Sequence, residues 1–234
     1  MHYQFDFSAV LHGDYLHWFI SGTAVTLELF AVAWAGSIVL GIVLAIIRQS
    51  GLRVGAAAVA AYVEYHRNVP LVVQLLFWYF AAPSLFPASL RDYLATHGSE
   101  FPLASVALVL CAAAYVSEDL RSGFRAIPRG QLEAGRALGM SYLSTMRMVL
   151  MPQALRVSLP SLVNQALLLF KNTSLAMAIG IAELTYQAKE VDSNTFLTFE
   201  AFAVATVIYL VLSFAIMFCG SMLARRFNVA GAGR

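Results

Sequence analysis

The side chains of this chain that could do chemistry are charged and polar groups placed inside apolar stretches. The clearest group is Lys171, Asn172, Thr173 and Ser174, which interrupts a long apolar run. A charged side chain at membrane depth costs about 2.5 to 3.5 kcal/mol on insertion scales, so it needs a function or a partner. Lys171 could meet a substrate carboxylate, while its polar neighbours could hydrogen-bond backbone groups freed by a break in the helix. The alternative is a packing role, in which Lys171 pairs with an acid of a neighbouring span.

A second set of charges precedes or ends other apolar stretches. Glu64 and Arg67 are three residues apart, so they would share one helical face and could neutralise each other near a membrane boundary. The same two residues could instead contact a substrate. Glu118 and Asp119 have arginines close by in the sequence, and we expect these two acids to be structural.

The sequence lacks the motifs that would make this chain an enzyme in its own right. It contains no Gly-Lys pair, so the phosphate-binding loop of an ATPase is absent. It also has no His/Cys metal cluster and no Ser-His-acid set. Cys111 and Cys219 both lie in apolar stretches, where cysteine behaves as a small buried hydrophobe. We therefore expect no catalytic residue, no metal and no cofactor on this chain.

The elements that must position these side chains are membrane helices. Sixty percent of the residues are hydrophobic and 12% are charged, whereas soluble domains carry about 25% charged residues. A helix needs about 20 apolar residues to cross the hydrocarbon core. We predict an all-α membrane protein with five spans at 23–47, 69–86, 102–116, 159–184 and 199–223. An Ala-rich segment, 54–63, either lies along the interface or extends the second span.

Orientation follows from the positions of the basic residues. If the N-terminus is outside, almost all arginines lie on or beside the cytoplasmic side, and only Arg91 and Lys189 lie outside. This asymmetry predicts a periplasmic N-terminal segment (1–22), a membrane domain (23–223) and a cytoplasmic C-terminal tail (224–234).

The longest polar connection, about 121–156, is then cytoplasmic, and it is too long to be a simple link. It is predicted to form two short helices. The first covers 132–138 and stops at Gly139, and Ser141 can cap the second. One apolar stripe on the second helix would consist of Leu143, Met146 and Leu150. The alternative is a hairpin that merely lies on the membrane.

This loop resembles the EAA loop of ABC importer membrane subunits. The family pattern is Glu-Ala-Ala, three residues, Gly, nine residues, Ile, any residue, Leu, Pro. The spacing is the same here, with three small or apolar departures. The matching positions are Glu133, Ala134, Gly135 (for Ala), Gly139, Val149 (for Ile), Met151 (for Leu) and Pro152. In the family this loop is a coupling helix that docks in a groove of the ATPase subunit.

Other segments resemble the polar amino acid permeases of the same class. Residues 64–75 resemble the pattern Glu, two residues, Arg, Gly, Thr, Pro, Leu, two apolar residues, Gln, and this match adds Gln74 to Glu64 and Arg67 as candidate pathway residues. Asn68 replaces the Gly, a variant associated with the glutamate/aspartate branch. Residues 170–175 also match, and the resemblance covers about 23–223.

The resemblance implies a MetI-like permease bundle in a bacterial inner membrane. Two permease subunits, identical or homologous, would frame the pathway for glutamate or aspartate. A P-loop ATPase dimer would carry the ATP and Mg²⁺, and a periplasmic amino-acid-binding protein would deliver the substrate. The lipid bilayer is the remaining partner, and no nucleic acid is expected.

The alternative function is a stand-alone proton-coupled secondary transporter that uses Glu28, Glu64 or Glu118. Such folds usually contain two repeated halves around a midplane site. No internal repeat is evident among the five predicted spans, so the importer subunit is the favoured interpretation.

Overall fold

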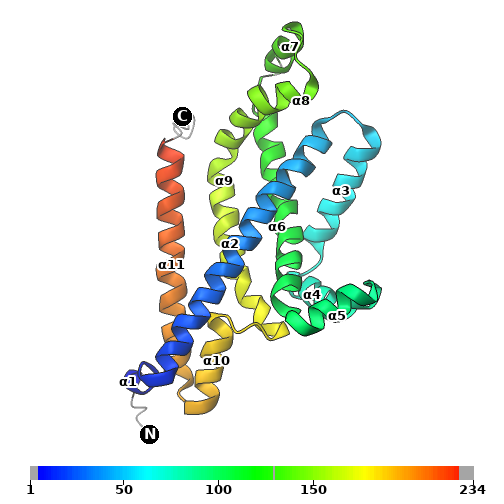
Figure 1. The fold of residues 1–234 in the computed structure, drawn as a ribbon. Coiled ribbons are helices and arrows are strands. Elements are labelled where there is room, and N and C mark those ends of the chain that lie inside the picture. The colour runs from blue at the N-terminus through cyan, green and yellow to red at the C-terminus, as the bar shows by residue number, and fades with distance from the viewer. Residues whose placement is uncertain (1–4, 129, 227–234) are drawn as a thin grey trace. The chain divides into compact units, whose positions relative to one another are not determined.

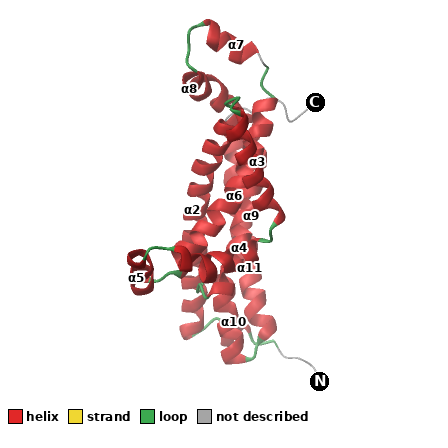
Figure 2. Ribbon diagram, turned by 90° about the vertical axis from the view of Figure 1, so that its right-hand side faces the viewer, coloured by secondary structure: helices red, strands yellow, loops and turns green. Residues whose placement is uncertain are grey.

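The computed structural model describes residues 5–128 and 130–226, and within these ranges every regular element is a helix (Figures 1 and 2). The all-α prediction is therefore confirmed. Most of the predicted tail, 224–234, lies outside the described residues. The long helices are α2 (Gly13–Gln49), α6 (Glu100–Arg125), α9 (Met151–Asn172) and α11 (Thr198–Arg226). The shorter α-helices are α1 (Phe7–Val10), α3 (Arg53–Asn68), α4 (Leu71–Leu76), α5 (Ala88–His97), α7 (Gly130–Ala137), α8 (Tyr142–Thr145) and α10 (Leu184–Thr195).

Four helical segments of the described chain are long and apolar enough to cross a membrane. Three are α2, α6 and α11, and the fourth is the continuous run Tyr142–Ile179 that contains α9. A fifth span exists if α3 and the following segment, Leu71–Leu85, count together as one broken span. The predicted number of five thus depends on that broken segment.

The second predicted span is not one regular helix. The Ala-rich segment predicted at 54–63 is part of α3, which ends at Asn68. Val69 has extended backbone angles (φ −97°, ψ 127°) because the ring of Pro70 disfavours the helical conformation for the residue before it. After the break, α4 leads into a π-helical turn, η1 (Phe77–Ala81), and a 3₁₀ turn, η2 (Ala82–Leu85).

Both π-helical turns lie just before a proline. Pro83 follows η1, and Pro152 follows the second π turn, η3 (Met146–Leu150). A proline has no N–H to donate, and its ring clashes with the carbonyl one turn earlier. In both places the residue before the proline donates its N–H to the carbonyl of the first residue of the π turn. This hydrogen bond reaches back five residues, whereas an α-helical hydrogen bond reaches back four. The proline therefore explains why the turn widens there.

The chain divides into two compact units, and each long helix contributes residues to both. The first unit extends to Ala33 and includes Leu71–Leu108 and Leu168–Ala215. Its core joins α1, the first part of α2, α10 and the first part of α11. The buried members are Val10, Phe19, Leu184, Ala188, Val191, Ala201 and Ala205.

The second unit consists of Trp34–Pro70, Val109–Leu167 and the residues from Ile216 onward. Its main core joins the second part of α2, the second part of α6, η3 and α9. The buried members are Ala45, Val116, Leu120, Phe124, Met146, Leu150, Met151, Ala154 and Leu162. A smaller cluster attaches α3 through Val59 and Val63, which pack with Ala114 of α6.

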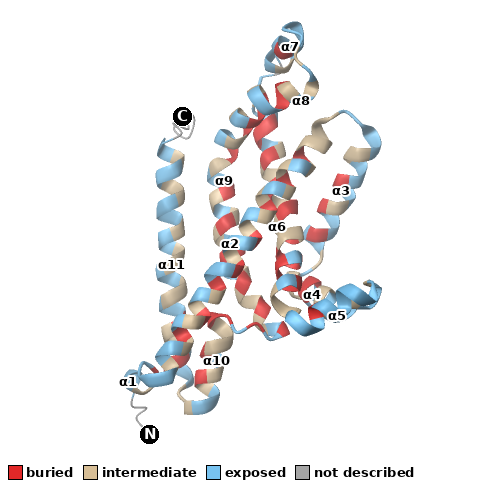
Figure 3. Ribbon diagram, in the orientation of Figure 1, coloured by how far each residue is buried: buried red, intermediate tan, exposed pale blue. Residues whose placement is uncertain are grey.

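Large apolar side chains remain on the outside of the membrane helices. Along α11 these include Val207, Val211, Phe214 and Phe218, each more than half exposed (Figure 3). Exposed apolar surface of this extent is unfavourable in water and marks contact with lipid or with another protein. α2 also begins at Gly13, ahead of the predicted start at Thr23.

Candidate coupling hairpin and substrate pocket

The loop predicted to couple to an ATPase is a helical hairpin in the second unit. α7 and α8 are joined by a turn in which Gly139 has a left-handed backbone (φ +74°). The N–H of Met140 donates to the carbonyl of Gly135 (3.0 Å), which closes a Schellman-type helix end with glycine at the left-handed position. Ser141 caps α8, since its Oγ accepts from the N–H of Ser144 (3.2 Å). The predicted roles of Gly139 and Ser141 in shaping the hairpin are confirmed.

The hairpin is held closed by a close approach of α7 to α8. A Cβ atom on Gly135 would lie 2.7 Å from Cγ2 of Thr145, inside van der Waals contact. Both residues are buried, and the Thr145 hydroxyl donates to the carbonyl of Ser141 (3.0 Å). A glycine is therefore required opposite this threonine.

The predicted apolar stripe is only partly buried within this chain. Met146 and Leu150 are buried, whereas Leu143 is 67% exposed. Thr145 of α8 and Met146, which begins η3, are buried. Tyr142 of α8 is half-buried, and its hydroxyl donates to the carbonyl of Ile46 (3.1 Å).

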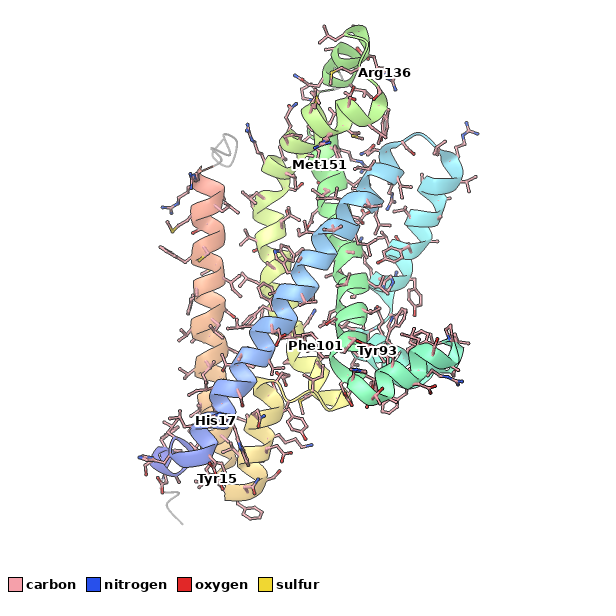
Figure 4. All side chains as sticks on the ribbon, in the orientation of Figure 1. Tyr15, His17, Tyr93, Phe101, Arg136 and Met151 are labelled. Carbon is pink, nitrogen blue, oxygen red and sulfur yellow. The ribbon has the colours of Figure 1, made fainter. Side chains whose placement is uncertain are left out.

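The outer surface of the hairpin carries both polar and apolar groups. Glu133 and Ala134 of α7 are exposed, as is Gly139, and Leu138 is 80% exposed. Arg136 also lies on α7 and is exposed (Figure 4). Of the other candidate coupling residues, Val149 is half-buried, Met151 is buried and Pro152 is exposed.

The polar interruption at 171–174 lies in the first unit, where α9 ends. Asn172 is the last residue of α9, and the chain continues as a 3₁₀ helix, η4 (Thr173–Ile179). The Thr173 hydroxyl donates to the carbonyl of Phe170 (2.7 Å), and the Ser174 hydroxyl donates to that of Lys171 (2.7 Å). The α-helix ends within the polar residues, but the helical run itself continues, so the predicted break is a change from α- to 3₁₀-helix in which hydroxyl groups bond nearby carbonyls.

A pocket of about 340 Å³ lies beside this break, within the first unit. Its lining residues are Lys171, Ser174, Thr185, Phe202, Ala205, Thr206 and Tyr209. The side chain of Lys171 is exposed, and the ion pairs of the described residues do not include it. The structure therefore does not support the alternative in which Lys171 pairs with an acid from another span. A single ammonium group in a pocket of hydroxyl groups can bind an anionic group.

A buried carboxylate supports the wall of this pocket. Glu183 is fully buried at the N-cap of α10, where it accepts from the N–H groups of Thr185 (3.0 Å) and Tyr186 (2.9 Å). The Tyr209 hydroxyl donates to the same carboxylate (2.8 Å) and lies 3.0 Å from the Thr185 hydroxyl. Burial raises the pKa of Glu183 above its ordinary value, although these hydrogen bonds act in the opposite direction.

Sequence reasoning missed Glu183, Thr185 and Tyr209 as parts of one site. No role was assigned to Glu183 from the sequence. Its position before the apolar and hydroxyl residues that open α10 is the signal that could have identified a helix cap. Nothing in the sequence indicated that Tyr209 would meet it.

The remaining candidate pathway residues are divided between the units. Gln74 belongs to the first unit and is buried in α4, which packs against η4. Glu64 and Arg67 belong to the second unit, and both are exposed on α3. The suggested mutual neutralisation of Glu64 and Arg67 is not observed. Asn68, one turn further on, donates to Glu64 Oε2 (3.1 Å), and Arg67 lies over the ring of Tyr115 (5.6 Å).

Comparison with known proteins identifies the class of this chain. The family described as "Binding-protein-dependent transport system inner membrane component" matches residues 37–229. The glutamine transport system permease protein GlnP of Escherichia coli (strain K12) is 34% identical over 226 residues, which cover 97% of this chain and 99% of GlnP. The arginine transport system permease protein ArtQ of Bacillus subtilis (strain 168) is 34% identical over 94% of this chain and 96% of ArtQ. The glutamate/aspartate import permease protein GltJ of Escherichia coli (strain K12) is 32% identical over 93% of this chain and 90% of GltJ.

A solved structure supports the same assignment. The fold is similar, at a TM-score of 0.79 and 32% identity, to a crystal structure of an amino acid ABC transporter with histidines, with 96% of this chain and 100% of that chain covered. Permease subunits of this kind are not themselves enzymes. The family match and the similarity to an amino acid ABC transporter favour an importer subunit over a proton-coupled stand-alone transporter. This chain therefore belongs to the family of binding-protein-dependent transport system inner membrane components, as a multi-pass permease subunit of an amino-acid ABC importer.

Proposed function

We propose that this permease imports acidic amino acids, glutamate or aspartate, and that its Lys171 pocket receives the substrate's α-carboxylate. The observation that carries this proposal is the Lys171 ammonium group, which lines a pocket of about 340 Å³ without an ion-pair partner among the described residues. That volume lies in the range of about 300–1,000 Å³ usual for small-ligand sites. Asn172, Thr173 and Ser174 hold the local helix break, and Gln74 belongs to the helix that packs on it.

The choice of acidic substrates rests on a different residue. Every amino acid has an α-carboxylate, so Lys171 does not distinguish one side chain from another. The Asn68 variant after Arg67 is the feature that favours the glutamate/aspartate branch. Named relatives include permeases for glutamine and arginine as well as for glutamate and aspartate, so substrate competition is the decisive measurement.

The energy for transport would come from partner subunits. In this proposal the hairpin of α7 and α8 docks on a P-loop ATPase dimer that binds ATP and Mg²⁺, and this chain holds no cofactor. A second permease subunit, identical or homologous, completes the pathway, and a periplasmic binding protein delivers the amino acid. The N-terminus is periplasmic and the C-terminus is cytoplasmic. The exposed Leu138 and Leu143 on the hairpin support a docked partner.

Uptake by the complete importer in liposomes tests the proposal. Excess unlabelled glutamate or aspartate should abolish uptake of labelled glutamate, whereas excess arginine or lysine should compete weakly. Lys171→Gln should raise the KM for the transported amino acid about tenfold or more, because it removes a charge-assisted contact worth about 1.5–3 kcal/mol. Lys189→Gln, at an exposed position of α10, is the matched control that removes the same charge in the same unit.

The two parts of the proposal fail separately. Strong inhibition by arginine with none by glutamate would refute the acidic substrate class. An unchanged KM in Lys171→Gln would refute the pocket, whatever the substrate is.

A further inference from the structure

Three arginines line a second pocket, which contains none of the residues assigned above to coupling or to the substrate. This pocket lies within the second unit and has a volume of about 440 Å³. Its lining residues are Arg48 and Gln49 at the end of α2, Ala56 and Ala57 near the start of α3, and Arg121 and Arg125 at the end of α6. The guanidinium groups therefore come from two different helices and face a wall of small side chains.

The charges of this pocket are only partly compensated. Glu118 accepts from Arg48 Nη1 (2.5 Å) and from Arg121 Nε (2.9 Å), so one carboxylate is shared by two guanidinium groups. Arg125 is exposed, and the ion pairs of the described residues do not include it. The three arginines that line the pocket and the Glu118 carboxylate that bonds two of them together carry a net charge of +2 at neutral pH. The Glu118 bonds hold two of the arginines in place, and Arg125 is free to bind an anion.

The position of the pocket indicates which anion is available. α2 and α6 are both candidate membrane spans, and the arginines lie in the last turn or so of each, where a span reaches the membrane surface. Leu52 and Val54, just before the alanines, are 67% and 84% exposed. Apolar side chains exposed beside an arginine pocket suit a membrane surface, where acyl chains and phosphate groups occur together. Guanidinium groups bind phosphate through paired, charge-assisted hydrogen bonds.

We propose that this pocket is a binding site for a phosphate group, supplied by the headgroup of an anionic phospholipid. Arg125 is the residue that the lipid phosphate engages directly, with Arg48 and Arg121 contributing positive charge from fixed positions. Ala56 and Ala57 leave the space that the headgroup occupies. Through this site, the content of anionic lipid in the membrane would affect the second unit, which also contains the coupling hairpin.

Lipid retention by the assembled importer tests this site. The complex is reconstituted in nanodiscs of phosphatidylcholine with phosphatidylglycerol, extracted into detergent, and analysed by native mass spectrometry for bound phosphatidylglycerol. Arg125→Gln should lower the apparent affinity for phosphatidylglycerol about tenfold or more, because it removes the charge-assisted hydrogen bonds that Arg125 makes to the phosphate group. Ala57→Leu should lower it as well, by filling the pocket without changing charge. Arg53→Gln is the control, since this exposed arginine begins α3 but does not line the pocket.

A second experiment distinguishes the phosphate of a lipid headgroup from free inorganic phosphate. Inorganic phosphate is added at the same ionic strength as a chloride control. Competition by inorganic phosphate would show that the site recognises the phosphate group from either source. Lipid binding that depends on Arg125 and resists inorganic phosphate would assign the site to the headgroup. Equal loss of lipid in Arg125→Gln and Arg53→Gln, or no loss in either, would overturn the proposal. So would loss of the ATPase from Arg125→Gln with unchanged lipid, which would make the pocket a protein contact.

Discussion

Gly135 determines how closely α7 can approach α8. The family pattern has alanine at this position, but here a Cβ atom would lie 2.7 Å from Thr145 Cγ2 and 2.9 Å from its Oγ1. Thr145 is fully buried and is held by its hydrogen bond to Ser141, so it has little freedom to move away. The departure from the family pattern therefore compensates for the threonine opposite.

Gly135→Ala should consequently be harmful, although it restores the residue that the family pattern has. We expect it to destabilise the closed hairpin by about 1–3 kcal/mol, the usual range for overpacking a buried contact. ATPase co-purification and uptake should both fall, while membrane insertion should not change. The double variant Gly135→Ala/Thr145→Ala should recover much of the loss.

Gly130→Ala is the matched control for this experiment. Gly130 begins α7, and no heavy atom lies within 4 Å of the position of its added Cβ. Uptake by Gly130→Ala should equal that of the wild type. If Gly135→Ala behaved in the same way, the close contact with Thr145 would not constrain the hairpin.

The same residues show what could be predicted of the candidate sites. The helix break at Lys171–Ser174 was predictable because polar groups inside an apolar run are costly unless they bond locally. The pocket beside it was not predictable, because Thr185, Phe202 and Tyr209 reach Lys171 only through the packing of three helices. Contacts between distant segments have no signal in residue spacing.

At the scale of an element, the coupling hairpin depends on the left-handed turn at Gly139. A β-branched residue is unfavourable at φ +74° by about 1–2 kcal/mol. Gly139→Val should therefore distort the turn and abolish transport, with the ATPase lost or no longer responsive to the loaded binding protein. Membrane expression should stay near normal because the hydrophobicity of the spans is unchanged. Uptake and ATPase co-purification are the measurements.

Asparagine provides the control for the backbone effect. No heavy atom lies within 4 Å of an added Cβ on Gly139, so the strain comes from the backbone angle rather than from a clash within the chain. Asparagine tolerates the left-handed conformation better than other side chains, so Gly139→Asn should retain substantial transport. Full transport by Gly139→Val would show that this hairpin is not the coupling element.

The existence of the helices was easier to predict than their internal form. Long apolar runs predict spans, and Gly139 and Ser141 mark a helix end and a helix start. The π turns before Pro83 and Pro152 were not predicted, since a proline can kink, end or widen a helix, and the surrounding packing decides which. The break at Pro70 likewise divides a predicted span that hydropathy alone joins.

At the scale of the whole molecule, the number of crossings determines where the two termini lie. Hydropathy predicted the all-helical membrane class, but four helices qualify alone and the fifth span requires α3 and the segment Leu71–Leu85 to act together. An even number of crossings would put both termini on one side. The distribution of arginines favours an odd number, because it places almost all of them on one side.

Accessibility of single cysteines tests whether α6 crosses the membrane in the direction that the five-span arrangement requires. Arg91→Cys on α5 and Gln131→Cys on α7 place thiols at exposed positions, in a background that lacks Cys111 and the exposed Cys219. A membrane-impermeant maleimide added to intact cells with a permeabilised outer membrane should label position 91 and leave position 131 unlabelled. Position 131 should react only after the inner membrane is opened. These outcomes follow because α6 is the one predicted span between the two positions, so they must lie on opposite sides. Labelling of both positions from the same side would show that α6 does not cross, and the five-span arrangement would be wrong.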